Sequence, residues 1–357
     1  MAAPAIPLFD LRMESEDFEA VDAVLASGRL AAGERVADFE AAFAAHLGTG
    51  HAIAVANCTA ALHLAYLAAG VGPGDEVIVP SITFAATAAA AVYCGARPVF
   101  ADVVSRTDLG IDADSVAARI TDRTRAVCAM HYAGYPADVE RLRALCDARG
   151  IALVEDAAHA PDTDLATGKA GTAGLVGCFS FFSNKVLAVG EGGALCTDSS
   201  AVAAGARTLR DGPLDYRFDE LRAALAQSRL GRMRADVAAR RALTQRYRDL
   251  LRQVPGVLVP YEDAEVDRSS CYVMPLVLED ATRRDAVRER MRDRHGVQTS
   301  LLYAAVHEFS AYVERYGTAS LPVSEAVARS QLTVPLFGHM THDDQDRVVA
   351  ALAEALR

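Results

Sequence analysis

The chain has 357 residues, of which 52% are apolar and 23% charged, a composition typical of a soluble globular protein with a large core. Its net charge of −11 argues against the basic face that a nucleic-acid or anionic-membrane surface requires. We therefore expect neither a nucleic acid nor a membrane among its partners.

Neither the N-terminus nor the longest uncharged run predicts membrane targeting. The first twenty residues turn acidic early and lack the pattern of a signal peptide. The run from Val77 to Ala96 contains Pro80 and several hydroxyls, so we interpret it as a strand, a loop and an Ala-rich helix. The seven cysteines form no CxxC pair, which favours a reduced, cytoplasmic protein. His339 and His342 are interpreted as a polar helix start, and no metal site is predicted.

From residue 51 onward, β-rich runs alternate with helical patterns. Strands are expected at 51–57, 75–80, 97–103, 124–132 and 151–158. Helices are expected at 59–70, in an Ala-rich segment that ends near 94, at 112–120 and at 138–150. Strands that alternate with helices predict βαβ units and a mainly parallel, buried sheet.

The second half of the chain predicts a different arrangement. Further strands are expected at 178–183 and 192–197, followed by a long helix at 217–253. An α+β unit comes next, with segments at 271–278 and 296–303 and between them a helix that runs through 294. The last helix is expected at 342–356. Residues 1–30 precede the first strand and could pack on either part. We predict an α/β fold with a large domain over residues 1–240 and a smaller C-terminal α+β domain over 241–357.

The first predicted strand ends in an unusual way, with the sequence "ANCTAAL". A strand ending at Asn57 and a helix beginning at Thr59 would make Thr59 the N-cap. The N–H groups of Thr59, Ala60 and Ala61 would then form an anion site, most naturally for a phosphate. The alternative is an ordinary helix start.

A later strand ends in two acids, in "IALVEDAAHA". Alternation along the strand puts Glu155 and Asp156 on opposite faces. Ligands of open α/β sheets bind beyond the carboxyl ends of strands, where an acid could hold a cationic ring nitrogen. A structural role for one of the two is the alternative.

Lys185, in "GCFSFFSNKVLAVGEGGAL", is one of only two lysines in the chain. An amine that must lose its proton to react has to be lysine, because arginine stays charged. Schiff-base chemistry is the commonest reason to keep such an amine. The other lysine, Lys169, lies among turn residues and is expected in an exposed loop.

Together, an anion site, an acid and a reactive amine describe one ligand, pyridoxal phosphate. The competing interpretation, a dinucleotide site, needs a Gly-rich fingerprint between the first strand and helix. "GVGPGDE" follows a helix instead.

At this point the chain resembles the DegT/DnrJ/EryC1/StrS family of sugar aminotransferases, which have the aspartate aminotransferase-like fold (fold type I). The resemblance covers nearly the whole chain and rests on ordered motifs. They are "LASGRLAAGERVADFEAAFA", "ANCTAALHLA", "VIVPSITFAATAAA", "GARPVFADV", "HYAGYPADV", "VEDAAHA", "GCFSFFSNKVLAVGEGGAL", "DYRFDELRAAL" and a final Tyr303 to His307 element.

The resemblance implies a role for each matching residue. Lys185 would be the Schiff-base lysine and proton carrier, Asp156 the pyridinium partner and His159 a neighbour of the ring. Ser180, with Thr59 and Ala60, would form the phosphate cup, and Phe84 would stack on the ring. Tyr303, His307 and Arg217 would lie on the substrate side.

Two departures from the family pattern concern the site. The family commonly has Asn-Tyr-Arg where this chain has Asp215, Tyr216 and Arg217, and that Asn reaches the phosphate in the neighbouring subunit. An acid there would repel a phosphate dianion. The usual Y-x-P-[LV]-H element reads "YAAVH" here.

The resemblance implies transamination from L-glutamate to a keto sugar nucleotide, in a homodimer with shared active sites. Relatives with a histidine at the lysine position dehydrate deoxysugars instead. "SFFSNK…GEGG" is closer to perosamine-type 4-aminotransferases, which favours a dTDP-4-keto-6-deoxyhexose. The alternatives are a 3-keto-sugar or aminocyclitol (inosose) aminotransferase, a lyase, and a non-catalytic regulator, which a basic DNA-binding appendage would favour.

Overall fold

The computed structural model describes residues 5–357 and contains one large sheet and one small sheet. The large sheet has seven strands in the order β1-β7-β6-β5-β4-β2-β3. Their bounds are β1 His51–Val55, β2 Glu76–Pro80, β3 Arg97–Ala101, β4 Thr124–Met130, β5 Ala152–Asp156, β6 Val176–Ser180 and β7 Gly193–Thr197. Only β7 runs antiparallel to its neighbours, so the expected mainly parallel sheet is confirmed.

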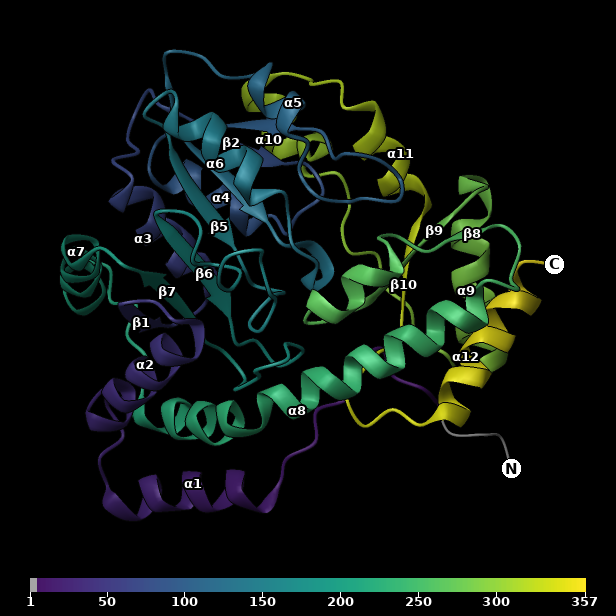
Figure 1. Ribbon diagram of the computed structural model, residues 1–357, viewed down its shortest axis with the longest axis horizontal. Helices are drawn as coiled ribbons and strands as arrows, with labels where there is room; N and C mark the ends of the chain where they lie inside the picture. The colour runs from purple at the N-terminus through teal and green to yellow at the C-terminus, as the bar shows by residue number, and fades with distance from the viewer. Residues whose placement is uncertain (1–4) are drawn as a thin grey trace.

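Helices cover both faces of this sheet (Figure 1). They are α2 Glu34–Leu47, α3 Cys58–Ala68, α4 Ala86–Tyr93, α5 Ala113–Ala117, α6 Val139–Asp147 and α7 Ser200–Asp211. Alternation along β2 shows the two layers, because Val77 and Val79 pack with α3 and α4 while Ile78 packs with α5 and α6. Burying each such side chain stabilises the fold by about 1.5–3 kcal/mol. The predicted uncharged run from residue 77 to 96 is thus divided between β2 and α4.

The second unit is built on a small antiparallel sheet in the order β10-β9-β8. Its elements are β8 Val257–Leu258, β9 Met274–Leu278, α9 Arg284–His295, α10 Ser310–Tyr316, α11 Pro322–Ser330, β10 Gln331–Val334 and α12 His342–Ala355. The strand suggested at 296–303 is reduced to bridges from Val297 to Ile6 and from Ser300 to Thr333, and β10, which we did not predict, takes its place beside β9.

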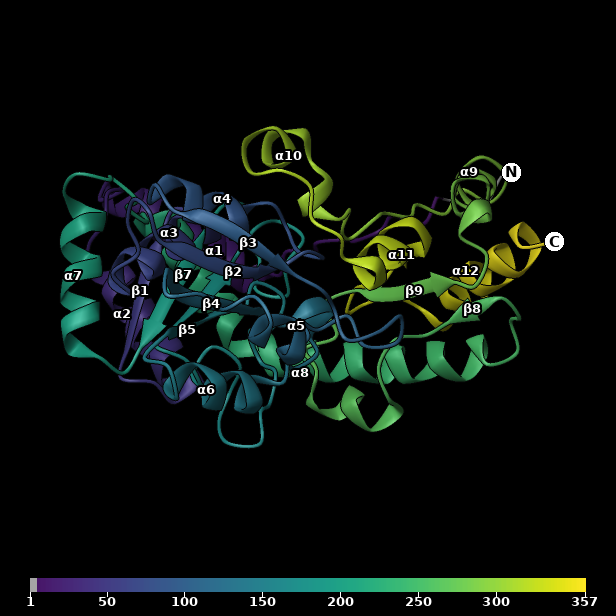
Figure 2. The same cartoon turned by 90° about the horizontal axis from the view of Figure 1, so that it is seen from above.

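The helix α8, Glu220–Leu251, links the two units. Figures 1 and 2 show the seven-stranded sheet near one end of α8 and the small sheet, α9 and α12 near the other. The residue taken as the domain boundary, Arg240, lies inside this continuous helix. The N-terminal segment contacts both units, since Ile6 pairs with Val297 while α1, Ser15–Ser27, packs on α8.

Within residues 5–357, no helix is both long and apolar enough to cross a membrane. Of the seven free cysteines, only Cys58 is partly exposed and the other six are buried.

Candidate active site

The carboxyl ends of β1, β5 and β6 lie at one edge of the large sheet. β1 and β6 are both antiparallel to β7, so they run in the same direction, and Gly193 of β7 is the register partner of both Val55 and Ser180. Gly193 also permits a close approach, because a Cβ there would lie 2.6 Å from the backbone carbon of Asn57. The start of α3 is therefore held next to the end of β6.

Lys185 follows β6 and its amine points into this edge. Its Nζ lies 4.2 Å from the centre of the Tyr272 ring. Burial lowers the pKa of Lys185 to about 8, against the opposing influence of Cys58 and Asp156. An amine with such a pKa is neutral in about one molecule in ten at pH 7, far more often than an ordinary lysine, and can act as a nucleophile.

Asp156 is the last residue of β5 and is only 2% exposed. Its Oδ2 accepts a hydrogen bond of 2.7 Å from the Thr87 hydroxyl, and its Oδ1 accepts one of 3.1 Å from the N–H of Ala158. Burial raises the pKa of Asp156, and the Thr87 and Ala158 hydrogen bonds and the positive charge of Lys185 only partly oppose it. A buried carboxyl in this state is stabilised by a further cationic partner.

Glu155, its neighbour, points the other way, as alternation predicted. It accepts hydrogen bonds from the N–H groups of Gly171, Ala173 and Gly174 and lies 2.9 Å from Nε2 of His131. Burial alone would raise the pKa of Glu155, but His131 and the backbone amides lower it below its usual value. Glu155 is therefore a structural residue that fixes the loop after β5.

His159 lies in that loop and is buried beside three tyrosines, Tyr132, Tyr272 and Tyr303. The N–H of Ala133 donates to its Nδ1 at 3.2 Å, so the proton of a neutral ring is on Nε2, 2.9 Å from the Tyr303 hydroxyl. Burial holds the pKa of His159 well below its usual value, so the ring is neutral. Phe84 completes the group, since its 57% exposed ring lies 5.8 Å from that of Tyr303.

The start of α3 differs from the prediction by one residue. The helix begins at Cys58 and its N-cap is Asn57, whose side chain accepts from the N–H of Ala60 at 2.9 Å. The N–H of Ala61 is bonded within the helix to the Asn57 carbonyl. Thr59 is therefore not the cap. Of the first four N–H groups of α3, those of Cys58 and Thr59 have no acceptor among the described residues, and they remain available to an anion.

Two residues expected on the substrate side lie apart from this group. Arg217, in the exposed segment before α8, donates to Asp215 at 2.6 Å. His307 is buried, with Nδ1 2.6 Å from the Ser81 hydroxyl and Nε2 3.7 Å from Glu325. Neither side chain contacts Lys185, Asp156 or His159 within the described residues.

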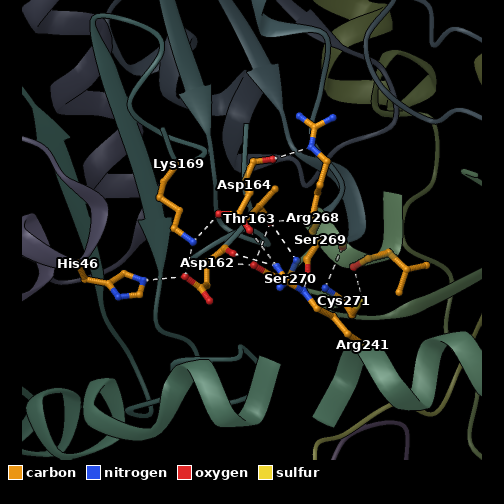
Figure 3. A network of polar contacts seen from close by, with 12 residues as sticks. His46, Asp162, Thr163, Asp164, Lys169, Arg241, Arg268, Ser269, Ser270 and Cys271 are labelled. Atoms are coloured by element: carbon orange, nitrogen blue, oxygen red, sulfur yellow. Dashed lines mark hydrogen bonds and ion pairs between the residues drawn. The ribbon is translucent and has the colours of Figure 1, made fainter. Parts of the chain in front are cut away.

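Lys169 is not in an exposed loop, which corrects our expectation. Its side chain is 19% exposed, and Nζ lies 2.8 Å from Asp162 and 2.7 Å from Asp164 (Figure 3). His46 contacts the same Asp162 carboxylate from α2, at 3.1 Å. Lys169 is thus held in ion pairs as a structural cation, which leaves Lys185 as the lysine of the site.

A cavity of about 230 Å³ reaches Lys185 from the side of α8, but neither Asp156 nor His159 lines it. Three of its arginines are already in ion pairs, Arg229 and Arg232 with Asp17 of α1 and Arg240 with Asp236. We therefore place the site at the sheet edge and not in this cavity.

Sequence reasoning missed Thr87, Cys58 and Tyr272. Thr87 lies in the predicted Ala-rich helix and Tyr272 in a predicted apolar strand, and neither pattern marks a functional residue. Cys58 lay inside the "ANCTAAL" motif and was interpreted only as a reduced core residue, although its thiol faces Lys185 and Asp156. Only the one-turn spacing of Thr83 and Thr87 could have been noticed.

Comparisons with known proteins agree over nearly the whole chain. The DegT/DnrJ/EryC1/StrS aminotransferase family matches residues 11–353. The chain is 35% identical to the dTDP-3-amino-3,4,6-trideoxy-alpha-D-glucose transaminase of Micromonospora megalomicea subsp. nigra, over 97% of this chain and 96% of that protein. The solved aminotransferase TlmJ from Streptoalloteichus hindustanus is 36% identical, with a TM-score of 0.92 and 99% of each chain covered. S. venezuelae DesV, solved in complex with a ketimine intermediate, is 35% identical, with a TM-score of 0.92 over 99% of this chain and 100% of that one.

Proposed function

Because the chain belongs to the DegT/DnrJ/EryC1/StrS aminotransferase family, we propose that it transfers an amino group from L-glutamate to a keto sugar nucleotide, using pyridoxal 5'-phosphate. The observation that carries this proposal is the convergence of Lys185 and Asp156, 29 residues apart, at one edge of the sheet. A non-catalytic regulator would not need an amine with a lowered pKa next to a buried acid.

The residues at the sheet edge fit this cofactor. Asp156 is a buried carboxyl with a raised pKa and forms no ion pair with any residue of 5–357, which suits a protonated ring nitrogen. The N–H groups of Cys58 and Thr59, with the Ser180 hydroxyl, would hold the phosphate. Phe84 and His159 would lie against the ring. When bound, pyridoxal phosphate supplies an aldehyde that captures amines and a ring that accepts electrons when a proton leaves the substrate carbon.

Lys185 has two tasks in this reaction. Its neutral Nζ would hold the cofactor by a covalent bond. The same Nζ, when free, would act as the base that carries the proton of the 1,3-shift from the donor carbon. Asp156 would hold the protonated ring nitrogen with its negative charge, which Thr87 supports by donating to Oδ2.

We propose a dTDP-4-keto-6-deoxyhexose as the acceptor, because "SFFSNK…GEGG" resembles the 4-aminotransferases. A 3-keto sugar is the second candidate, favoured by the 35% identity to a transaminase named for a 3-amino sugar. Incubation with L-glutamate and a panel of 3-keto and 4-keto nucleotide sugars, followed by mass spectrometry and NMR of the products, decides between them. Amination of the 3-keto sugars alone would refute the 4-keto proposal.

We further propose a cytoplasmic homodimer whose active sites are shared between subunits. Phe84 and Phe182 are 57% and 42% exposed, which suits cover by a second copy. The buried, unpaired cysteines suit a reducing compartment. Light scattering coupled to size-exclusion chromatography should give twice the chain mass, and a monomer with full activity would contradict shared sites.

A further inference from the structure

Tyr272 closes the site on the side of Lys185. Its ring is 3% exposed and lies 4.2 Å from Nζ of Lys185. The same ring lies 4.2 Å from that of His159, at 37°. Tyr272 thus contacts both the reactive amine and the imidazole of the site, although it comes from the segment that leads into β9.

The backbone of Tyr272 is fixed on both sides. Its N–H donates to the Ala133 carbonyl at 2.9 Å, and its carbonyl accepts from Nη1 of Arg240 in α8 at 3.3 Å. Tyr272 is therefore tied to the loop after β4 and to the helix that links the two units.

The residues before Tyr272 are locked by a buried network, drawn in Figure 3. Thr163 donates to the Gly134 carbonyl at 2.6 Å, so its hydroxyl oxygen accepts from Ser270, whose Oγ is 2.9 Å away. Ser270 Oγ in turn accepts from the N–H of Asp162 at 3.0 Å. Because these bonds join the Tyr272 segment to the loop that carries His159, both rings are positioned by the same network.

The groups that interact with Nζ of Lys185 come from four parts of the chain. Tyr272, from the β9 side, contacts it with its ring, and Cys58 of α3, Asp156 of β5 and His159 of the following loop interact with it electrostatically. Burial raises the pKa of the Cys58 thiol and lowers that of His159, so both are neutral. Burial also raises the pKa of the Tyr272 hydroxyl, which stays protonated. Among these four groups, Asp156 is then the only anion, and the Tyr272 ring face is the only other group that attracts a cation.

We propose that Tyr272 is a catalytic residue of this site, whose ring face binds the protonated amine of Lys185 while that amine is free of the cofactor. The inference rests on the proposed role of Lys185. A freed lysine that has accepted a proton is a cation in a buried site, and the negative face of an aromatic ring stabilises it there. The ring also holds Nζ in place between its two proton transfers, so that the side chain does not turn away.

The test uses the fact that the chain has only two lysines, Lys169 and Lys185. The full-length protein, freed of cofactor, is acylated with acetic anhydride across a pH series, and the two lysine peptides are quantified by mass spectrometry. The midpoint of Lys185 acylation gives its pKa directly, while Lys169, held by Asp162 and Asp164, serves as an internal reference for folding.

Two matched variants isolate the ring face. Tyr272→Phe keeps the face and removes only the hydroxyl, so the Lys185 midpoint should stay near that of the parent. Pentafluorophenylalanine at position 272 keeps the shape and reverses the quadrupole, and should lower the midpoint by about half to one pH unit relative to Phe. Equal midpoints in these two variants would overturn the proposal.

A further variant guards against misfolding of the fluorinated protein. Tyr272→Leu removes the aromatic face and should also lower the midpoint, and an unchanged or raised midpoint with normal Lys169 reactivity would again overturn the proposal. The result is independent of the proposed function, because the titration needs no cofactor. If Lys185→Ala still captured the cofactor, the proposed function would fail while the Tyr272 result stood.

Discussion

Asp156 accepts a 2.7 Å hydrogen bond from the hydroxyl of Thr87, a residue 69 positions earlier in α4. The bond opposes the rise that burial imposes on the pKa of Asp156. It therefore favours the charged carboxylate that the proposed mechanism requires.

This relationship predicts a difference between two substitutions of Thr87. Thr87→Val keeps the shape but removes the donor, so Asp156 loses a hydrogen bond to its charged form, and we expect kcat to fall by about tenfold. Thr87→Ser keeps the hydroxyl and should stay near the parent activity. Steady-state kinetics with glutamate and the accepted sugar measure both, and equal losses in the two variants would show that only packing matters.

The lowered pKa of Lys185 predicts how the cofactor-free protein captures pyridoxal phosphate as a function of pH. Only the neutral amine attacks, so the rate should rise about tenfold per pH unit in acid and level off above about 8. Stopped-flow absorbance measures the rate. A rise that continues to pH 10 would mean that Lys185 behaves as an ordinary exposed lysine.

Substitution of Glu155 should lower the stability of the fold, an effect separate from catalysis. In Glu155→Gln, an NH2 group, which is itself a donor, replaces one of the two carboxylate oxygens. It then meets either the donors at Oε2, Gly171 and His131, or those at Oε1, Ala173 and Gly174, and cannot accept from them. We expect a loss of about 3–5 kcal/mol in the free energy of unfolding at pH 7. Chemical denaturation measures it.

The sign of the pH dependence follows from the pKa of Glu155. Since the pKa is lower in the folded state than its usual 4.5, the parent's extra stability is present above 4.5 and is lost as the pH falls through the folded-state value. The difference in the free energy of unfolding between the parent and Glu155→Gln should therefore become smaller in acid. A gap that is constant from pH 7 to pH 3 would contradict this origin.

Substitution of Asp215 should increase the affinity of the protein for the cofactor. Its φ of 50° is one that Asn also tolerates, so Asp215→Asn should leave the backbone unchanged. If this residue faces the partner's phosphate, removal of its charge should tighten pyridoxal phosphate binding by about fivefold at low salt. Equilibrium titration measures the Kd, with Asp211→Asn as a control in the same exposed region. Unchanged affinity would place Asp215 away from the phosphate.

The sequence predicted the large sheet well because its strands are short apolar runs separated by clear helical patterns, as in β2, α4 and β3. The C-terminal unit was harder. β10 is four residues that follow α11 directly, and no turn separates them. The docking of Ile6 beside Val297 is a contact across the whole chain, and no local pattern encodes it.

The residues of the site also differ in how well the sequence predicts them. Lys185 and Asp156 were found because each is chemically unusual where it stands, an amine among arginines and an acid at the end of an apolar strand. Thr87 and Tyr272 carry no such signal, since a threonine in a helix and a tyrosine in an apolar strand are ordinary. Thr59 was taken for the cap because it begins the helical pattern, whereas the Asn57 side chain reaches the N–H of Ala60.

Borohydride trapping shows whether Lys185 is the amine that holds the cofactor. The protein is incubated with pyridoxal phosphate, reduced with borohydride and digested, and the modified peptide is identified by mass spectrometry. We predict the pyridoxyl group on the peptide that contains Lys185, and its loss when glutamate is added before reduction. Modification of Lys169 instead, or of neither lysine, would contradict the account.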